Sequence, residues 1–402
     1  MSGSPNITII VMDTMRLDAF SRLARSRGKA LAQLGDFVSL GRCVAPSPWT
    51  LPSHASLFTG MYPSEHGAHE TKRIKALDIQ QIKLRHKTFV SDLKEQGYKT
   101  YAISANPYVH PIYGFDEFDS FTEESYFTDM WGSVVEVAGS LKPLIAKYRN
   151  EYGNDLLKIS SAMLKEDPNL FFETAASGLA LTPMAALKKL KAKLLYSWPI
   201  EKGGKNIVKS VKSMKPKRPS FLFVNLMEAH DPYTESKRNA MSWVTPFLKR
   251  QPSGSTISLW KRLYAKASAK SYDYAYQIVK ELVERYGGDQ LIILTSDHGQ
   301  EFGEHEFIGH GAVLHDEVVK VPMAVMLPHG FDSSKVSGYA SLVNVRRFIS
   351  AVLEEDRYAF GQLFSRQVMA ESFGVPAQIS QIPGIDKKRL ASYEKTTKRR
   401  FG

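Results

Sequence analysis

Short apolar runs that contain β-branched residues recur along the chain and predict the strands of a buried sheet. These runs lie at 7–12 (ITIIVM), 99–104 (KTYAIS), 220–226 (SFLFVNL), 290–296 (QLIILTS) and 321–327 (VPMAVML). Runs of this length that do not alternate with polar residues are typical of strands covered on both faces. One further strand is predicted at 367–371 (QVMAE).

Helical periodicity occurs between these strands. The predicted helices cover 53–59, 88–96, 265–286 and 344–354; the first follows Pro52, and the next two end at glycines. Proline near a helix start and glycine past its end are the usual boundary residues. The alternation of strands and helices predicts an α/β layer fold.

The strand signal stops between about 121 and 218, where the sequence is helical, rich in lysine and interrupted by prolines. We interpret this stretch as a helical insertion into an α/β catalytic domain that spans 1–335. The remaining residues, 336–402, predict a small C-terminal subdomain that ends in a basic tail.

The formal net charge of +12, from 53 Lys and Arg against 41 Asp and Glu in 402 residues, raises the question of an anionic partner. The excess is local, because 188–218 holds 11 basic residues and 1 acid while 386–402 holds 7 and 2, so the rest of the chain is close to neutral. We therefore predict no specific nucleic-acid binding. Contact with a membrane surface or a polyanion would run through 188–218, for which a solvated helix face is the alternative interpretation.

The chain contains a single cysteine, Cys43, which excludes an intramolecular disulfide. This usage is typical of a reducing compartment. No run approaches the roughly 18 apolar residues of a membrane span. We expect a cytoplasmic protein.

Polar residues after a strand or at the start of a helix are the first candidates for chemistry. Asp13 follows the strand 7–12, and its carboxylate is either a cation ligand or the N-cap of a helix over 14–22. Thr50 precedes Pro52 and therefore stands at a helix N-terminus, where backbone amides and the helix dipole favour an oxyanion. The Thr50 hydroxyl is either a nucleophile or only a cap.

Histidines follow two of the later strands. His230 and Asp231 come after the strand 220–226, in the sequence HDPY. The strand 290–296 is followed by a stretch that holds five candidate ligands within 19 residues: Asp297, His298, His305, His310 and His315. An adjacent Asp-His pair at a strand end, flanked by glycines, favours a metal or anion site over chance clustering on a loop.

Taken in order, these motifs resemble the sulfatase family of the alkaline phosphatase superfamily. The matching features are Asp13, TLPSHASLFTG from Thr50, YPSEHG at 62–67, HDPY at His230, DHG at Asp297 and GHGAVLHDEVVKVP at 309–322. The resemblance covers roughly residues 5–120 and 219–355. It implies an alkaline-phosphatase-like three-layer sandwich with a central mixed, mostly parallel sheet.

The chain departs from the sulfatase pattern at the nucleophile. Sulfatases carry a Cys or Ser that is oxidised to formylglycine, and Thr50 stands at that place here. Oxidation of threonine would give a ketone rather than an aldehyde, because its β-carbon carries a methyl group, so we expect no formylglycine. His54 replaces the family's arginine, and Asn106 and His110 stand near the place of the substrate-binding Lys and His.

Threonine is the nucleophile in related members of the superfamily, and this resemblance implies roles for the site residues. One divalent metal, held by Asp13, Asp297, His298 and the Thr50 oxygen, would activate Thr50. The other catalytic residues implied are His310, in place of a lysine that assists the leaving group, His230, which would hold an anionic oxygen, and His54. Asn106 and His110 are the predicted substrate-binding residues.

The ligand types favour Mn²⁺ or Zn²⁺, because one ligand is an imidazole, although Ca²⁺ and Mg²⁺ stay open. A two-metal arrangement would need a further aspartate and two histidines near the first site. Asp231, His305 and His310 could be recruited, but HDPY has a sulfatase-like context, so one metal is the prediction.

We therefore predict a sulfatase-like, metal-dependent hydrolase that acts on an anionic sulfuric or phosphoric ester, phosphodiesters included. Two alternatives stay open. A phosphoglycerol- or phosphoethanolamine-type transferase would share the first step and pass the group to an acceptor alcohol. A catalytically degenerate member would be a basic binding protein, although the retained Asp13, Thr50, Asp297 and His298 argue against it.

Overall fold

The computed structural model describes residues 4–70, 79–124, 161–162, 164–165, 200–234, 241, 244–334, 336–375 and 384–396. Its strands are β1 (Asn6–Met12), β2 (Phe37–Val44), β3 (Lys99–Ser104), β4 (Ser120–Glu123), β5 (Ser220–Leu226), β6 (Gln290–Thr295), β7 (Glu301–Phe302), β8 (Ile308–Gly309), β9 (Lys320–Met326), β10 (Tyr339–Ser341) and β11 (Phe364–Ser365). Within the described residues, nine strands form one sheet in the order β11-β10-β2-β9-β6-β1-β5-β3-β4, and β7 pairs with β8.

The centre of the sheet is parallel. Strand β1 pairs in parallel with both β5 and β6, while β3 adds to β5 and β4 adds to β3 in the same direction. Strand β9 is antiparallel to β6 and to β2. Because β1, β5 and β6 point the same way, the residues that follow them meet at one edge of the sheet.

The helices of the described residues are α1 (Leu17–Ala32), α2 (Thr50–Thr59), α3 (Pro63–His66), α4 (Ile79–Ile82), α5 (Phe89–Glu95), α9 (Gly204–Ser213), α10 (Gly254–Tyr286), α11 (Asp316–Val319), α12 (Val345–Leu353) and α13 (Lys387–Thr396). Short 3₁₀ turns lie at η1 (Pro111–Tyr113), η2 (Thr245–Phe247), η3 (Leu342–Asn344) and η4 (Ala359–Leu363). None of these helices is both long and apolar enough to span a membrane.

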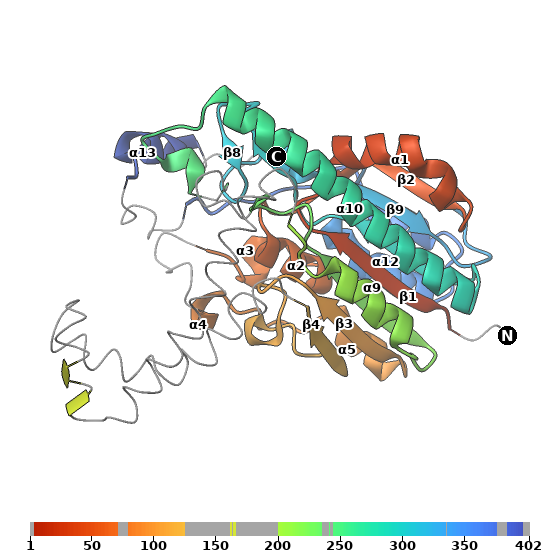
Figure 1. The fold of residues 1–402 in the computed structure, drawn as a ribbon. Coiled ribbons are helices and arrows are strands. Elements are labelled where there is room, and N and C mark those ends of the chain that lie inside the picture. Colours follow the sequence, from red (N-terminus) through yellow and green to blue (C-terminus); the bar gives the residue numbers. More distant parts are fainter. Residues whose placement is uncertain are drawn as a thin grey trace.

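Helices cover both faces of the sheet (Figure 1). Alternate residues of β1 face opposite ways: Ile7 and Ile9 join a core with α2, α5 and α12, whereas Ile10 joins a second core with α1, α9 and α10. Continuous apolar strands are required because both faces of each strand are buried. The predicted α/β three-layer sandwich with a mixed, mostly parallel sheet is confirmed.

The five apolar runs correspond to β1, β3, β5, β6 and β9, and the four periodic segments correspond to α2, α5, α10 and α12. The strand predicted at 367–371 is wrong: these residues are irregular, and the chain instead forms the short β11 before them. Three of the eight residues of β2 are exposed, and a bulge lies between Leu40 and Cys43, so its sequence lacks the apolar run used for prediction.

The boundaries of the predicted insertion need correction. Strand β4 and helix α9 fall inside the predicted stretch 121–218, yet β4 extends the sheet and α9 packs on it through Ile207 and Val211. Most of the intervening sequence lies outside the described residues. The predicted boundary near 335 likewise does not coincide with an edge of the sheet, because β10, α12 and β11 belong to the sheet and its core. Among the described residues of the C-terminal segment, α13 packs apart from the sheet, on Phe247 and Phe307, together with Val375 and Ile385.

Candidate active site

The predicted residues meet where β1, β5 and β6 end. Asp13 follows β1, and its backbone N–H donates to the carbonyl of Leu226 at the end of β5 (2.8 Å). Asp297 and His298 follow β6, and Thr50 begins α2 on the same edge. All four side chains are buried, which places chemistry-bearing groups where parallel α/β sheets bind ligands.

His298 Nε2 lies at the centre of this group. It is 3.4 Å from the Asp297 Oδ2 and 3.4 Å from the Thr50 hydroxyl. The Asp13 Oδ1 is 3.9 Å away. The four residues predicted as ligands of one metal are therefore brought together.

The capping alternatives for Asp13 and Thr50 do not hold. Helix α1 begins only at Leu17, and the Asp13 carboxylate accepts hydrogen bonds from the Thr14 hydroxyl (2.8 Å) and from Asn106 Nδ2 (2.7 Å). Helix α2 has Trp49 as its N-cap residue and no side-chain cap hydrogen bond, while the Thr50 hydroxyl is directed to His298. Neither side chain is therefore used to cap a helix.

Two asparagines hold the group in place. Asn106, which the sequence predicted as a substrate-binding residue, donates to Asp13 and to the Thr50 Oγ1 (3.3 Å). Asn225 near the end of β5 donates to Asp13 Oδ2 (3.5 Å) and to His54 Nε2 (3.3 Å). Sequence reasoning missed Asn225; its only signal was a polar residue in an otherwise apolar strand.

His54 supports the start of α2 from behind. Its Nδ1 donates to the Thr50 carbonyl (2.9 Å), which leaves Nε2 to accept from Asn225. The Asp297 Oδ2 is 3.6 Å from the same Nδ1. Both ring nitrogens are engaged and the ring is fully buried, so His54 supports the backbone of Thr50 and lies beside the Asp297 carboxylate.

The residues present fit a divalent metal. His298 Nδ1 donates to the Gly299 carbonyl (3.0 Å), so the lone pair of Nε2 faces the carboxylates. Asp297 Oδ1 accepts from the backbone N–H groups of Thr14 and His298, whereas its Oδ2 is buried with no hydrogen-bond partner among the described residues. A buried, unpaired carboxylate oxygen beside a second carboxylate is what a cation would complete.

The pKa shifts of Asp13 and Asp297 agree with a site for a cation. Burial, and then the adjacent Asp13 carboxylate, raise the pKa of Asp297. Burial would also raise the pKa of Asp13, but His230, His298 and His54 outweigh it and lower that pKa. Ligand atoms of Asp13, Asp297 and His298 all lie within 4.8 Å of one another, and two buried carboxylates this close cannot both ionise easily without added positive charge.

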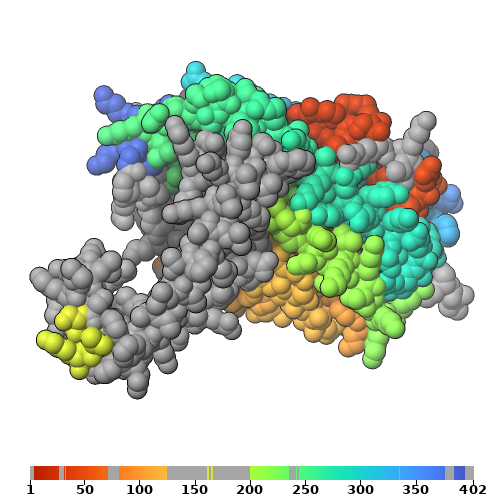
Figure 2. Space-filling model, in the orientation of Figure 1, coloured from red at the N-terminus to blue at the C-terminus, as the bar shows by residue number. Residues whose placement is uncertain are grey.

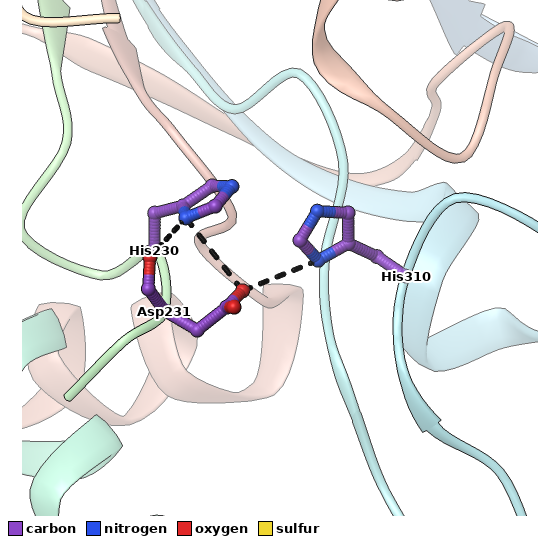
Figure 3. Close-up of side chains that lie close together, drawn as sticks. All are labelled: His230, Asp231 and His310. Carbon is purple, nitrogen blue, oxygen red and sulfur yellow. Dashed lines mark hydrogen bonds and ion pairs between the residues drawn. The ribbon is translucent and has the colours of Figure 1, made fainter. Parts of the chain in front are cut away.

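His230, Asp231 and His310 form a neighbouring group, and their potential ligand atoms all lie within 4.8 Å of one another. Figure 3 shows both rings next to the Asp231 carboxylate, each joined to it by a dashed line. Asp231 Oδ1 is 3.6 Å from His230 Nδ1 and 3.7 Å from His310 Nδ1 and has no hydrogen-bond partner among the described residues. The His310 ring lies 4.4 Å from the His298 ring, so the two groups adjoin.

His310 is oriented by Gln300, a residue that sequence reasoning missed. Gln300 is fully buried, and its Oε1 accepts from His310 Nδ1 (2.6 Å), which leaves His310 Nε2 without the proton. Burial, followed by the imidazoles of His298 and His230, lowers the pKa of His310 well below its usual range. This direction favours the neutral form of the ring.

A family model described as Sulfatase matches residues 5–354. The chain belongs to the sulfatase family. A 65-residue stretch is 35% identical to the low-salt glycan biosynthesis sulfotransferase Agl7 of Haloferax volcanii and covers 16% of this chain and 14% of that protein. The match therefore spans a small part of the curated relative.

Solved structures share the fold at low identity. The C-terminal periplasmic domain of EcEptC from Escherichia coli, in complex with Zn, has a TM-score of 0.56 at 10% identity and covers 96% of each chain. The phosphonate monoester hydrolase of Agrobacterium radiobacter has a TM-score of 0.54 at 15% identity, over 87% of this chain and 74% of that one. Both share the architecture of this sulfatase-family protein.

The sulfatase-family site also contains a lysine that the sequence did not single out. Lys202, just before α9, is 1% exposed, and its ammonium donates to the carbonyls of Glu228 (3.3 Å) and His230. Burial lowers the pKa of Lys202 to about 8 despite the nearby Asp231 carboxylate. The lysine ties the turn that carries His230 and Asp231 to the chain entering α9.

His110 has local contacts in this sulfatase-family structure. Its Nδ1 accepts from the Ile112 N–H (3.2 Å) at the start of η1, its ring packs edge-on against Phe121, and Glu123 lies 3.8 Å from its Nε2. These contacts serve the η1 turn and β4. Asn106 is thus the predicted substrate-binding residue that the structure places beside Thr50.

Proposed function

We propose that this protein is a metal-dependent hydrolase of phosphoric or sulfuric esters with Thr50 as its nucleophile. The observation that carries the proposal is the Thr50 hydroxyl, which caps no helix and lies 3.4 Å from His298 Nε2 within the buried ligand group. When bound by Asp13, Asp297, His298 and the Thr50 oxygen, one divalent cation would supply the charge that acidifies a hydroxyl and neutralises an ester.

The chain's own residues would then carry two displacements. Thr50 would lose its hydroxyl proton to solvent, and its Oγ1 would form a bond to phosphorus or sulfur as the bond to the leaving oxygen breaks. Asn106, which already contacts Thr50 Oγ1, and the first amides of α2 would face the equatorial oxygens. Water next attacks the Thr50 ester and releases Thr50 and the acid. We lean to phosphoric esters, because a threonine nucleophile replaces the formylglycine of the sulfatases.

His230 and His310 would serve the substrate's charged atoms. We assign His230 to an anionic ester oxygen and His310 to protonation of the leaving oxygen. Since its pKa is lowered, His310 must first gain a proton, and an anionic ester placed against the ring favours this. A neutral His310 cannot protonate the leaving oxygen, so the bound substrate itself would have to favour the protonated form of the ring.

Metal identity is part of the same proposal. One imidazole among oxygen ligands favours Mn²⁺ or Zn²⁺ over Ca²⁺ or Mg²⁺. The zinc complex of the similar EcEptC domain supports zinc as the first ion to test. No formylglycine is expected, since the nucleophile position holds threonine.

A transferase is the second candidate, supported by the similarity to Agl7, a sulfotransferase by name. It would differ only in the final step, where an acceptor alcohol replaces water. A degenerate binding protein is disfavoured, because a buried Asp297 oxygen without a partner costs stability unless a cation completes it.

Metal analysis of purified protein, combined with assays on aryl sulfate, phosphomonoester and phosphodiester substrates, tests the proposal. Thr50→Ala should lower kcat at least about 1,000-fold, and Asp297→Ala should also lose the metal. Thr122→Ala, an exposed threonine on β4, is the matched control. Full activity of Thr50→Ala toward every ester that the native protein cleaves would refute it. Added acceptor alcohols distinguish transfer from hydrolysis.

We also propose contact with an anionic surface through 188–218. Residues 188–199 lie outside the described residues, but α9 exposes Lys205, Lys209 and Lys212 while its apolar side is buried in the core. Contact would therefore be electrostatic. Lys209→Glu/Lys212→Glu should reduce binding to vesicles that contain phosphatidylserine, and unchanged binding would reject the idea. The cytoplasmic location stays a prediction.

A further inference from the structure

A group of metal-type ligands lies outside the pocket, at the β7-β8 hairpin and α11. Its members are Glu301 on β7, His305 in the turn of the hairpin, His315 just before α11 and Glu317 on α11. His315 Nδ1 is 2.6 Å from Glu301 Oε1, and His305 Nε2 is 3.0 Å from Glu317 Oε2 and 4.0 Å from Glu301 Oε1. The two imidazole rings are 4.4 Å apart.

The burial and charge of this group favour a bound cation. Glu301 is fully buried, while His305 and His315 are 48% and 37% exposed and Glu317 is 22% exposed. In the part of the chain that the structure describes, the ion-pair partners recorded for Glu301 are these two histidines. With neutral imidazoles, the group has two negative charges, one of them desolvated, which a single divalent ion would balance.

We propose that Glu301, His305 and His315, whose ligand atoms all lie within 4.8 Å of one another, form a second zinc site, separate from the ligand group around Thr50. The Glu317 carboxylate lies beside this site, at His305 Nε2. Two imidazoles and a carboxylate are a donor set that zinc accepts, with the fourth tetrahedral position left for water. Bonds of about 2.0–2.1 Å place tetrahedral ligand atoms about 3.3 Å apart, and the separations of 2.6 and 4.0 Å between Glu301 Oε1 and the two histidines lie on either side of that value.

A metal at this site would fix the position of the loop that follows β6. Backbone hydrogen bonds already join this loop to α11: the Gly299 N–H donates to Val318 O (2.7 Å), and the Gln300 N–H donates to Glu317 O (3.0 Å). Gln300 in turn holds His310. A zinc ion that binds Glu301 on β7 and His315 just before α11 would fix these positions, so its role is structural and does not depend on the reaction catalysed.

Zinc titration of the full-length chain tests the proposal. A parent variant, Asp297→Ala/His310→Ala, removes one potential ligand from the group around Thr50 and one from the group of His230, Asp231 and His310. We expect this folded parent to bind one Zn²⁺ per chain, by calorimetry and by metal analysis after gel filtration. Adding His305→Ala and His315→Ala should weaken binding at least about 100-fold. Adding His329→Ala, an 84% exposed histidine paired only with Asp289 in the recorded ion pairs, should change nothing.

The native chain provides a second comparison that does not rely on the parent folding. Native protein should bind one more Zn²⁺ than His315→Ala and show a larger zinc-induced rise in Tm. The proposal is overturned if the parent binds no zinc, or if zinc binding and the rise in Tm are the same with and without these histidines. In that case the four residues form only a proton-dependent ion-pair network.

Discussion

His66 supports the helix that carries Thr50, and its protonation should destabilise the protein. His66 is 4% exposed, and its Nδ1 accepts a hydrogen bond from the Ala68 N–H (3.0 Å). Nε2 therefore carries the hydrogen and meets the Ser56 hydroxyl on α2 (3.0 Å). A proton added to Nδ1 would face the N–H of Ala68, so the buried ring resists the charged form.

The magnitude follows from the pKa. Burial, and then the nearby His69, lower the pKa of His66 from 6.5 to about 4. Between these values the unfolded chain binds the proton and the folded chain does not, so stability is complete above pH 6.5 and is lost as the pH falls toward 4. A difference of 2.5 units at 1.36 kcal/mol per unit gives a loss of about 3 kcal/mol.

Urea unfolding of the native protein and of His66→Gln, at pH 7 and at pH 4, measures this term. The variant is less stable at pH 7 but lacks the titration, so the difference in unfolding free energy between the two proteins should shrink by about 3 kcal/mol on acidification. His329→Gln, at an exposed position, should track the native protein. A gap between native protein and His66→Gln that stays constant across this range would refute the reasoning.

Three further outcomes are expected. Lys202→Met should release the turn that holds His230 and lower kcat/KM roughly 10- to 100-fold, since small displacements of reacting groups cost this much. A Lys202→Arg variant that lacks the hydrogen bonds to this turn and yet keeps full activity would contradict this expectation. Asn106→Ala removes a 2.7 Å hydrogen bond to Asp13 and should weaken the affinity of the proposed Thr50 site for its metal about 10- to 100-fold, measured by competition with a chelator. Cys43, whose thiol pKa is raised by burial, should resist alkylation in the native protein and react after unfolding, and stoichiometric labelling of native protein would be the contrary result.

The sequence pattern predicted the strands whose surroundings require apolar residues on both faces. Strands β1, β5 and β6 are buried on both faces, so nearly every residue must be apolar and the run is visible without knowledge of the neighbours. Strand β2 lies nearer the edge, with Ser39, Gly41 and Arg42 exposed, and its place depends on pairing with distant β9. Such pairing is a property of the assembled sheet.

The motifs Asp13, Thr50 and DHG at Asp297 were likewise sufficient, by themselves, to indicate the family and the main ligand group, because strand ends and a helix start bring few residues to the carboxyl edge. The tertiary structure alone excludes a capping role for Asp13 and Thr50, because it gives their side chains partners from residues that follow other strands.

Tertiary structure alone identified Asn225, Gln300 and Lys202. Asn225 stood out only as a polar residue in an apolar strand, and the local sequences of Gln300 and Lys202 carry no distinguishing signal. The importance of all three comes from the groups that folding places beside them: a carboxylate, an imidazole and two carbonyls. The sequence marked His305 and His315 as candidate ligands, but only the fold brings them within 4.8 Å of Glu301. Residue types and strand-end positions are encoded locally, whereas the distances between side chains that make a site depend on the packing of the whole sheet.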